Sequence, residues 1–255
     1  MRFWTFLLNT LFPPVCVSCK SEGDFLCMDC LKGLRKKKIR PNTKKIPDPD
    51  LHHLDGVIYG LDYAKNPQIK AAVKQFKYRF TQELADHFAD LIAEKIEQLN
   101  MVKGRQIILI PVPLHKKRLN YRGFNQAEVI ARAVQDRFKD KAEIVPLLKR
   151  VRHTDQQAKL DKRARHENLK GAFKISNQFC HSDRSGGMNT KFTHEQKNCS
   201  FRNNSVIFIV DDVCTTGSTL ENCAQVLKSE FPIRVYGLVI ARAVREKSKA
   251  IPFPR

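Results

Sequence analysis

Four short segments of the chain carry apolar residues in the pattern of β-strands. IILIPVP (107–113) and VIFIV (206–210) are apolar at every position, which is typical of strands buried on both faces of a parallel sheet. RVYGLVIAR (234–242) predicts a third strand, and VIYGLDY (57–63) alternates between apolar and polar positions in the manner of a strand.

Segments with a helical period lie between these strands. In residues 83–99 apolar side chains recur three or four positions apart, and Pro67 opens another helical segment that runs to Phe76. Residues 127–138 and 219–228 predict two more helices. The alternation of strands and helices predicts an α/β domain with an open, mostly parallel sheet.

The turn after the strand at 206–210 combines two acids with small hydroxylated residues. Asp211 and Asp212 are expected at the carboxyl edge of the sheet, where open α/β sheets bind ligands. The backbone N–H groups at the start of the next helix, with nearby hydroxyls and a glycine, form a cup for an anion. Five residues make this cup: Thr215, Thr216, Gly217, Ser218 and Thr219. Acids for a diol beside a cup for a phosphate predict a ribose 5-phosphate site, and the alternative is an ordinary strand followed by helix caps.

A basic turn, LHKKRLNYRGFNQ, follows the strand at 107–113. In a parallel sheet this turn lies at the same edge as Asp211, so Lys117, Arg118 and Arg122 are expected to face an anionic ligand. Arg118 is the best candidate, because a guanidinium group binds phosphate through two hydrogen bonds. The alternative is a solvated basic turn.

Two Cys-x-x-Cys pairs lie near the amino terminus, with only seven residues between them. Four thiolates suffice for a tetrahedral zinc site, and about thirty residues cannot build a core unaided, so metal-driven folding is expected. The expected ligands are Cys16, Cys19, Cys27 and Cys30. Two disulfides are the alternative.

Composition narrows the class of partner and the compartment. The net charge of +20 over 255 residues implies an anionic partner, which can be a phosphorylated small molecule, nucleic acid or an acidic protein. No segment approaches the ~20 consecutive apolar residues of a membrane span, and no small-residue cleavage site follows the short apolar opening at 1–14. We therefore expect a cytoplasmic protein with reduced cysteines.

Several motifs resemble known families. VIFIVDDVCTTGST (206–219) resembles the phosphoribosyl pyrophosphate (PRPP) motif of type I phosphoribosyltransferases. The segments at 110–128 and 152–173 and the opening LFPPVCVSCK are similar to the ComF family, phosphoribosyltransferase-like proteins linked to natural competence. The resemblance covers nearly the whole chain in the family's order. The departure is the polar insertion at 177–205, which lies between elements and should leave the fold intact.

The resemblance implies specific roles. Asp211 and Asp212 would hold the ribose hydroxyls of Mg²⁺-bound PRPP, and residues 215–219 its 5′-phosphate. The turn at 114–126 would be the pyrophosphate loop, and residues 150–170 a mobile loop that closes over PRPP. Catalysis would then depend on Asp211, Asp212 and Arg118.

Four sections follow from these motifs. Residues 1–34 form the expected zinc-binding module and residues 35–54 a basic, Pro-containing linker. Residues 55–255 form the phosphoribosyltransferase domain, in which the aperiodic stretch 177–205 reads as a disordered insertion.

Two functions remain open at this stage. The first is an enzyme that transfers the phosphoribosyl group of Mg²⁺-PRPP to an acceptor that the sequence does not name. The second is a non-catalytic adaptor that senses PRPP while it works with single-stranded DNA and a competence helicase. Aromatic and basic residues at 76–80 could stack bases, although a helix end is the simpler explanation.

Overall fold

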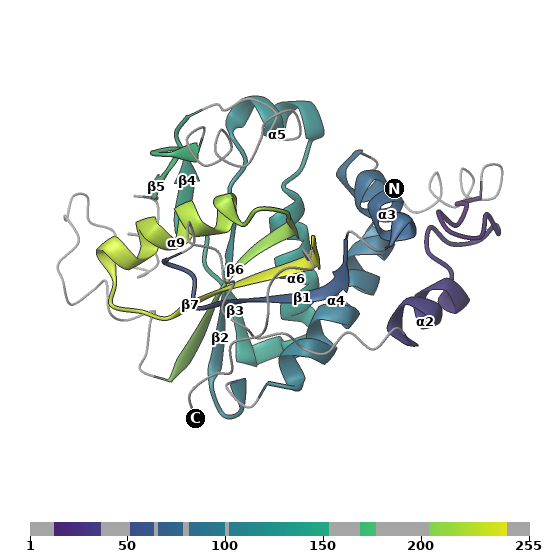
Figure 1. Ribbon diagram of the computed structural model, residues 1–255, viewed down its shortest axis with the longest axis horizontal. Coiled ribbons are helices and arrows are strands. Elements are labelled where there is room, and N and C mark those ends of the chain that lie inside the picture. Colours follow the sequence, from purple (N-terminus) through teal and green to yellow (C-terminus); the bar gives the residue numbers. More distant parts are fainter. Residues whose placement is uncertain are drawn as a thin grey trace, which may run out of the picture.

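The computed structural model describes residues 13–36, 52–63, 66–78, 82–99, 102–152, 169–176 and 204–243. It confirms an α/β fold with an open parallel sheet, preceded by a four-cysteine region (Figure 1). The elements are α2 (Met28–Lys36), β1 (Gly56–Asp62), α3 (Pro67–Tyr78), α4 (Gln82–Glu97), β2 (Gln106–Pro111), α5 (Lys116–Arg122), α6 (Gln126–Phe138), η2 (Lys139–Lys141), β3 (Ala142–Ile144), β4 (Leu148–Arg150), β5 (Phe173–Ile175), β6 (Ser205–Cys214), α9 (Ser218–Glu230) and β7 (Val235–Arg242).

The main sheet has the strand order β1-β7-β6-β2-β3, and all neighbouring strands are parallel. In the register between β2 and β6, Pro111 lies opposite Val210. The turn after β2 therefore starts level with Asp211, as the sequence predicted for the basic turn. Strands β4 and β5 form a separate antiparallel hairpin.

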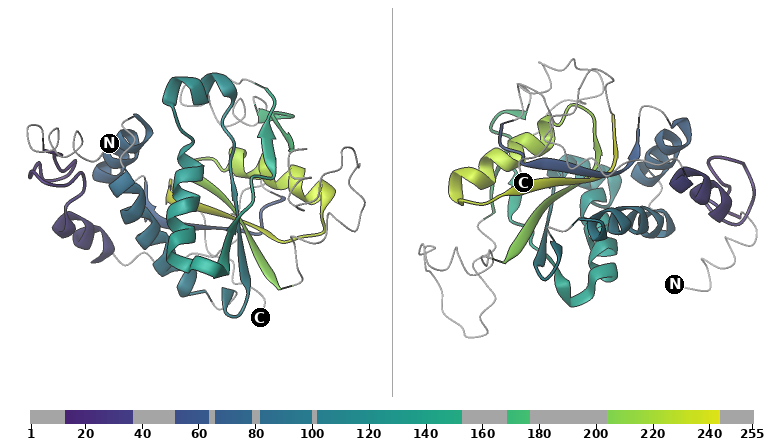
Figure 2. Two further views of the ribbon diagram at one scale, coloured as in Figure 1. Left: turned by 180° about the vertical axis from the view of Figure 1, so that it is seen from behind. Right: turned by 60° about the horizontal axis from the view of Figure 1, so that its bottom comes forward.

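Helices and the hairpin cover the two faces of the sheet (Figures 1 and 2). Helices α3, α4 and α6 pack on one face, and α9 with the β4–β5 hairpin packs on the other. Strand β2 supplies both cores, because Ile107 and Leu109 join the first and Ile108 and Ile110 join the second. This two-sided burial explains why the strand is apolar at every position.

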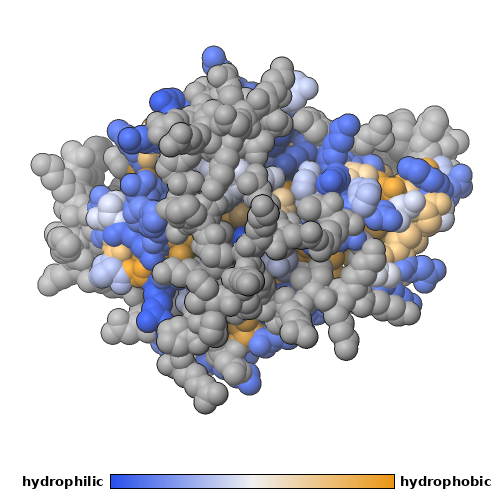
Figure 3. All heavy atoms as spheres, viewed as in Figure 1, coloured by the Kyte–Doolittle hydropathy of each residue, from blue (hydrophilic) through white to orange (hydrophobic). Residues whose placement is uncertain are grey.

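The four-cysteine region packs against the domain. Leu26 and Leu31 are buried in the same core as α3 and α4, and the Asp24 carboxylate lies 3.2 Å from Nε2 of His87. Hydrophobic surface also gathers on this region at the right of Figure 3, and its exposed apolar residues include Val15 and Met28.

The structure bears on the ends of two predicted segments. Helix α2 extends into the expected linker (35–54) as far as Lys36. Leu54, the last residue of that linker, is buried. Ser205, the last residue of the expected insertion, begins β6. The interiors of both segments, residues 37–51 and 177–203, lie outside the described residues, so the section boundaries stay predictions. Among the described helices, none has the length and apolarity needed to cross a membrane.

A buried carboxylate joins the start of β1 to α9. Glu221, in the first turn of α9, accepts hydrogen bonds at Oε1 from the backbone N–H groups of His52 and His53 at 2.6 and 2.7 Å. Its Oε2 accepts from the N–H of Leu54 at 3.2 Å. Helix α9 also lies close to β7, since a Cβ on Gly237 would be 2.8 Å from the Leu220 side chain. These contacts fix the helix that follows the Asp pair.

We predict that Glu221→Gln lowers the free energy of unfolding by about 2 kcal/mol, because an amide cannot replace a carboxylate that accepts from three N–H groups. Urea denaturation measures the change. Glu128→Gln is the control, since Glu128 forms an exposed ion pair with Arg132 within α6, and its loss should cost less than about 0.5 kcal/mol. Equal losses in both variants would contradict a structural role for the Glu221 carboxylate.

Candidate functional site

A cavity of about 480 Å³ opens at the carboxyl ends of β2 and β6. It brings together the two regions that the sequence predicted to meet, the β6–α9 turn and the basic turn after β2. The predicted residues on its wall are Arg118, Arg122, Asp211, Asp212, Thr215 and Thr219. The wall also includes Tyr63 and Lys77, which the sequence did not predict, and Tyr121, Gln126 and Arg150, which lie in predicted loops but were not named as ligand-binding residues.

The β6–α9 turn presents the start of a helix to this cavity. Gly217 has φ 83°, a left-handed conformation that favours glycine, and it precedes α9 without a capping side chain. Thr216 Oγ1 lies 2.9 Å from Ser218 Oγ, so these two hydroxyls shape the turn. Thr215 and Thr219 line the cavity instead. The Ser218 N–H donates to Thr216 Oγ1 at 3.4 Å, and the start of this thirteen-residue helix, with two hydroxyls beside it, suits an anion.

The two acids have different surroundings. Asp212 is 7% exposed, and its Oδ2 forms an ion pair with Nζ of Lys77 at 3.0 Å. Asp211 accepts a hydrogen bond at Oδ1 from the N–H of Asp212 at 2.8 Å. Burial, and then the charge of Asp212, raise the pKa of Asp211 to about 7, against the opposing effects of Lys77 and Arg150. Asp211 is therefore poised to lose its proton when a cation or hydroxyl donors arrive.

Lys77 is the main residue that sequence reasoning missed. The motif at 76–80 suggested base stacking, but Phe76 is fully buried and packs against Phe88 and Phe124, at centroid distances of 5.9 and 6.1 Å. That interpretation is wrong for Phe76, because the ring fills the core beneath α3. The next side chain, Lys77, reaches Asp212, whose charge raises the pKa of the lysine although burial opposes it. No local signal in the sequence connects these two residues.

Hydrogen bonds hold the basic turn in place. Asn125 caps α6 and donates from Nδ2 to the carbonyl of Val112 at 3.1 Å. Gln126, only 2% exposed, accepts from Arg122 at 3.0 Å and donates to the Lys77 carbonyl at 3.4 Å. This one amide therefore links the basic turn to the end of α3. Lys117 is exposed and is not among the residues that line the cavity.

The four predicted metal ligands lie together. The Sγ atoms of Cys16, Cys19, Cys27 and Cys30 are all within 4.8 Å of one another, and those of Cys19 and Cys27 are 3.5 Å apart. The thiols are free, which disfavours the disulfide alternative. A tetrahedron with zinc–sulfur bonds of about 2.3 Å has edges of about 3.8 Å, so the cluster fits zinc. Hydrogen bonds from Ser21 lower the pKa of Cys19 to about 6, which favours the metal-binding thiolate.

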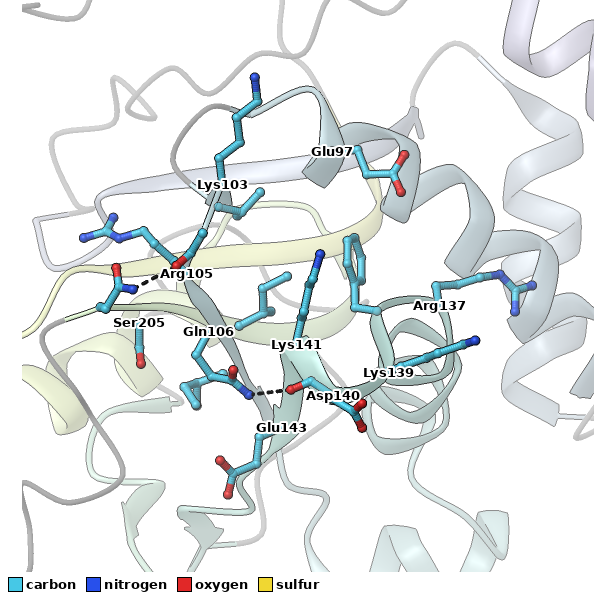
Figure 4. Close-up of a pocket in the computed structure, with 16 residues that line it drawn as sticks. Glu97, Lys103, Arg105, Gln106, Arg137, Lys139, Asp140, Lys141, Glu143 and Ser205 are labelled. Carbon is cyan, nitrogen blue, oxygen red and sulfur yellow. Dashed lines mark hydrogen bonds between the residues drawn. The ribbon is translucent and has the colours of Figure 1, made fainter.

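A larger hollow of about 1300 Å³ lies at the opposite, amino-terminal edge of β2, β3 and β6 (Figure 4). Its wall contains five Lys or Arg residues and three acids, and none of the predicted site residues. Hydrogen bonds such as that from Gln106 to the Asp140 carbonyl join its parts. Its mixed charge and its position far from the Asp pair separate it from the candidate site.

Comparisons with known proteins give a consistent result. No protein-family model matches the chain. The chain is 30% identical to Competence protein F of Haemophilus influenzae over 236 residues, which cover 89% of this chain and 85% of that protein. It is 29% identical to the DNA utilization protein YhgH of Salmonella typhimurium over 163 residues, and 26% identical to Competence protein ComFC of Bacillus subtilis over 165 residues. These two matches cover 63% and 65% of this chain but only 61% and 55% of the relatives.

Protein purified under reducing conditions should contain about one zinc ion per chain, and Cys27→Ser should lose it, because three thiolates hold zinc less tightly than four. Metal analysis by mass spectrometry measures the content. Cys223→Ala is the control, since it removes a buried sulfur from the core on the far face of the sheet and should keep its zinc. Wild-type protein without zinc would reject the site.

The raised pKa of Asp211 predicts a pH-dependent stability. The folded chain holds the Asp211 proton up to about pH 7, whereas the unfolded chain loses it near pH 4. The free energy of unfolding therefore falls as the pH rises from about 4 toward 7. Asp211→Asn should therefore raise the melting temperature by several degrees at pH 8, and the gain should vanish near pH 4. Thermal melts across this range measure it. Asp136→Asn, at an exposed position of α6, should show no such trend.

Proposed function

The chain belongs to the ComF family of competence proteins, and on this basis we propose that it binds Mg²⁺-PRPP and takes part in DNA uptake. The observation that carries the PRPP proposal is the composition of the 480 Å³ cavity. Its lining includes two acids, the start of helix α9 and four Lys or Arg side chains. A phosphoribosyl group needs acceptors for its hydroxyls close to donors for its phosphate, and this cavity offers both.

Each part of the cavity has a role in this proposal. Asp211 and Asp212 accept hydrogen bonds from the ribose hydroxyls. The first turn of α9, with the hydroxyls of Thr215 and Thr219, holds the 5′-phosphate. Arg118 and Arg122 bind the pyrophosphate through their guanidinium groups. A bound Mg²⁺ would neutralise part of the pyrophosphate charge.

Lys77 keeps the site ready before the ligand arrives. Its ammonium group forms an ion pair with the buried Asp212 at 3.0 Å and so offsets the cost of burying this acid. When ribose hydroxyls take over as donors to Asp212, the ammonium group becomes available to the pyrophosphate. The same exchange removes the proton of Asp211, so PRPP affinity should rise as the pH approaches 7 from below and level off above it.

The chemical outcome has two candidate forms. In the enzyme, the cations stabilise departing pyrophosphate while an acceptor attacks C1 of the ribose. The expected closing loop falls mostly on residues 153–168, which lie outside the described residues. In the adaptor, PRPP binding is a signal and the protein works with single-stranded DNA and a helicase. The names of the relatives, competence and DNA utilization proteins, support a DNA role for both forms. Release of pyrophosphate from PRPP in the presence of bases or amines distinguishes them.

The double variant Asp211→Asn with Asp212→Asn should weaken PRPP binding at least a hundredfold. It keeps the shape of both side chains but removes two charge-assisted acceptors, each worth on the order of 1.5–3 kcal/mol. Calorimetric titration with Mg²⁺-PRPP at pH 8 measures the affinity.

The matched control is Asp136→Asn with Asp140→Asn, which removes two exposed acids from the other end of the sheet. Because PRPP is an anion, loss of negative charge alone should leave binding unchanged or slightly tighter in this control. If the site variant binds like the wild type, or the wild type does not bind, the proposed function is wrong.

A further inference from the structure

Three described segments at one end of the molecule are strongly basic. The segments 112–127, 145–152 and 169–176 contain nine Lys or Arg residues and no Asp or Glu. Helix α5 and the β4–β5 hairpin carry most of them and lie at the same end in Figures 1 and 2. We call this surface the basic rim, and its cations are Lys116, Lys117, Arg118, Arg122, Lys149, Arg150, Arg152, Lys170 and Lys174.

Like charges lie close together at two places in the basic rim. Lys149 and Lys174 lie directly opposite each other in the antiparallel pair of β4 and β5. Like charges in this position destabilise a hairpin, and neither lysine forms an ion pair with the residues that the structure describes. Burial, and then the charge of Arg118, lower the pKa of Arg150. A polyanion bound along the rim would turn these repulsions into attractions.

An exposed aromatic ring stands among these cations. Tyr121 of α5 is 81% exposed, and Leu119 and Val151 of the rim are also exposed. These are three of the five large hydrophobic side chains that are exposed among the described residues. Aromatic rings between positive charges bind single strands, because unpaired bases stack on the ring while phosphates meet the cations. A duplex hides its bases and an acidic peptide offers none, so the ring favours a single strand.

From these contacts we propose that the basic rim binds single-stranded nucleic acid, with Tyr121 as a stacking platform. Tyr121, Arg118 and Arg122 also line the 480 Å³ cavity. A strand on the rim therefore covers the mouth of that cavity, and strand and PRPP compete for the same guanidinium groups. The competition, but not strand binding itself, rests on the proposed function.

Binding of a fluorescein-labelled oligo(dT) strand, followed by anisotropy at several salt concentrations, tests the rim. Tyr121→Ala should weaken binding about 5- to 100-fold, as expected for one lost stacking contact, and Tyr121→Phe should restore it. The triple variant Lys116→Gln, Lys149→Gln and Lys174→Gln should reduce the slope of log affinity against log salt by about 2.

A control triple removes the same charge elsewhere. Lys32, Lys74 and Lys141 are exposed and lie on α2, α3 and the 3₁₀ turn η2, and their change to Gln should leave the slope nearly unchanged. Equal losses in both triples would overturn the rim as a site and leave only diffuse attraction. Wild-type affinity in Tyr121→Ala, or tighter binding of the matching duplex, would also overturn it.

Two further outcomes separate the rim from the proposed function. If the wild type binds PRPP but no oligo(dT), the rim proposal fails and the PRPP site stands. If it binds oligo(dT) through the rim but no PRPP, the proposed PRPP site fails and the rim proposal stands. When both bind, saturating Mg²⁺-PRPP should weaken strand binding at least tenfold. Unchanged strand affinity would contradict the proposed competition at the mouth of the cavity.

Discussion

Two neighbouring carboxylates at the end of β6, one buried and one half-buried, are the constraint around which the site is arranged. Like charges so close in a partly desolvated place would repel each other strongly. Two features reduce this repulsion: Lys77 forms an ion pair with Asp212, and the pKa of Asp211 is raised to about 7, so that Asp211 keeps its proton below that pH. The pair is thus balanced without a ligand, yet it favours any ligand that supplies donors or a cation.

Parallel pairing places the remaining parts of the site around the acids. Because β2 and β6 are in register at Pro111 and Val210, the basic turn leaves the sheet beside Asp211. Gln126 then links that turn to the carbonyl of Lys77. A second buried acid, Glu221, follows the same rule as the first pair, since backbone N–H groups from residues 52–54 surround it. Buried charge is tolerated at each place because partners are supplied from distant segments.

The distribution of positive charge distinguishes the two ends of the sheet. At the amino-terminal edge, cations alternate with acids around the 1300 Å³ hollow, so little net attraction for an anion results. At the carboxyl edge the residues described in the lining of the 480 Å³ cavity include four cations, Lys77, Arg118, Arg122 and Arg150, and the Asp pair. The charge of +20 therefore matters through its placement, and the end with the 480 Å³ cavity is the end for which we propose anionic ligands.

Local pattern alone determined the strands, the β6–α9 turn and the cysteine pairs. Each is a short-range signal, such as a run of buried apolar residues or a fixed Cys-x-x-Cys spacing, and the structure has the four predicted strands (β1, β2, β6 and β7) and the cysteine cluster where they were expected. The short strands β3, β4 and β5, and helix α5 within the basic turn, were not predicted. Only tertiary structure decided that Lys77 reaches Asp212, that Phe76 fills the core and that Lys149 faces Lys174. These contacts depend on how helices dock and strands pair across long stretches of chain. Sequence periodicity fixes which face of an element is buried, but not which distant residue it meets.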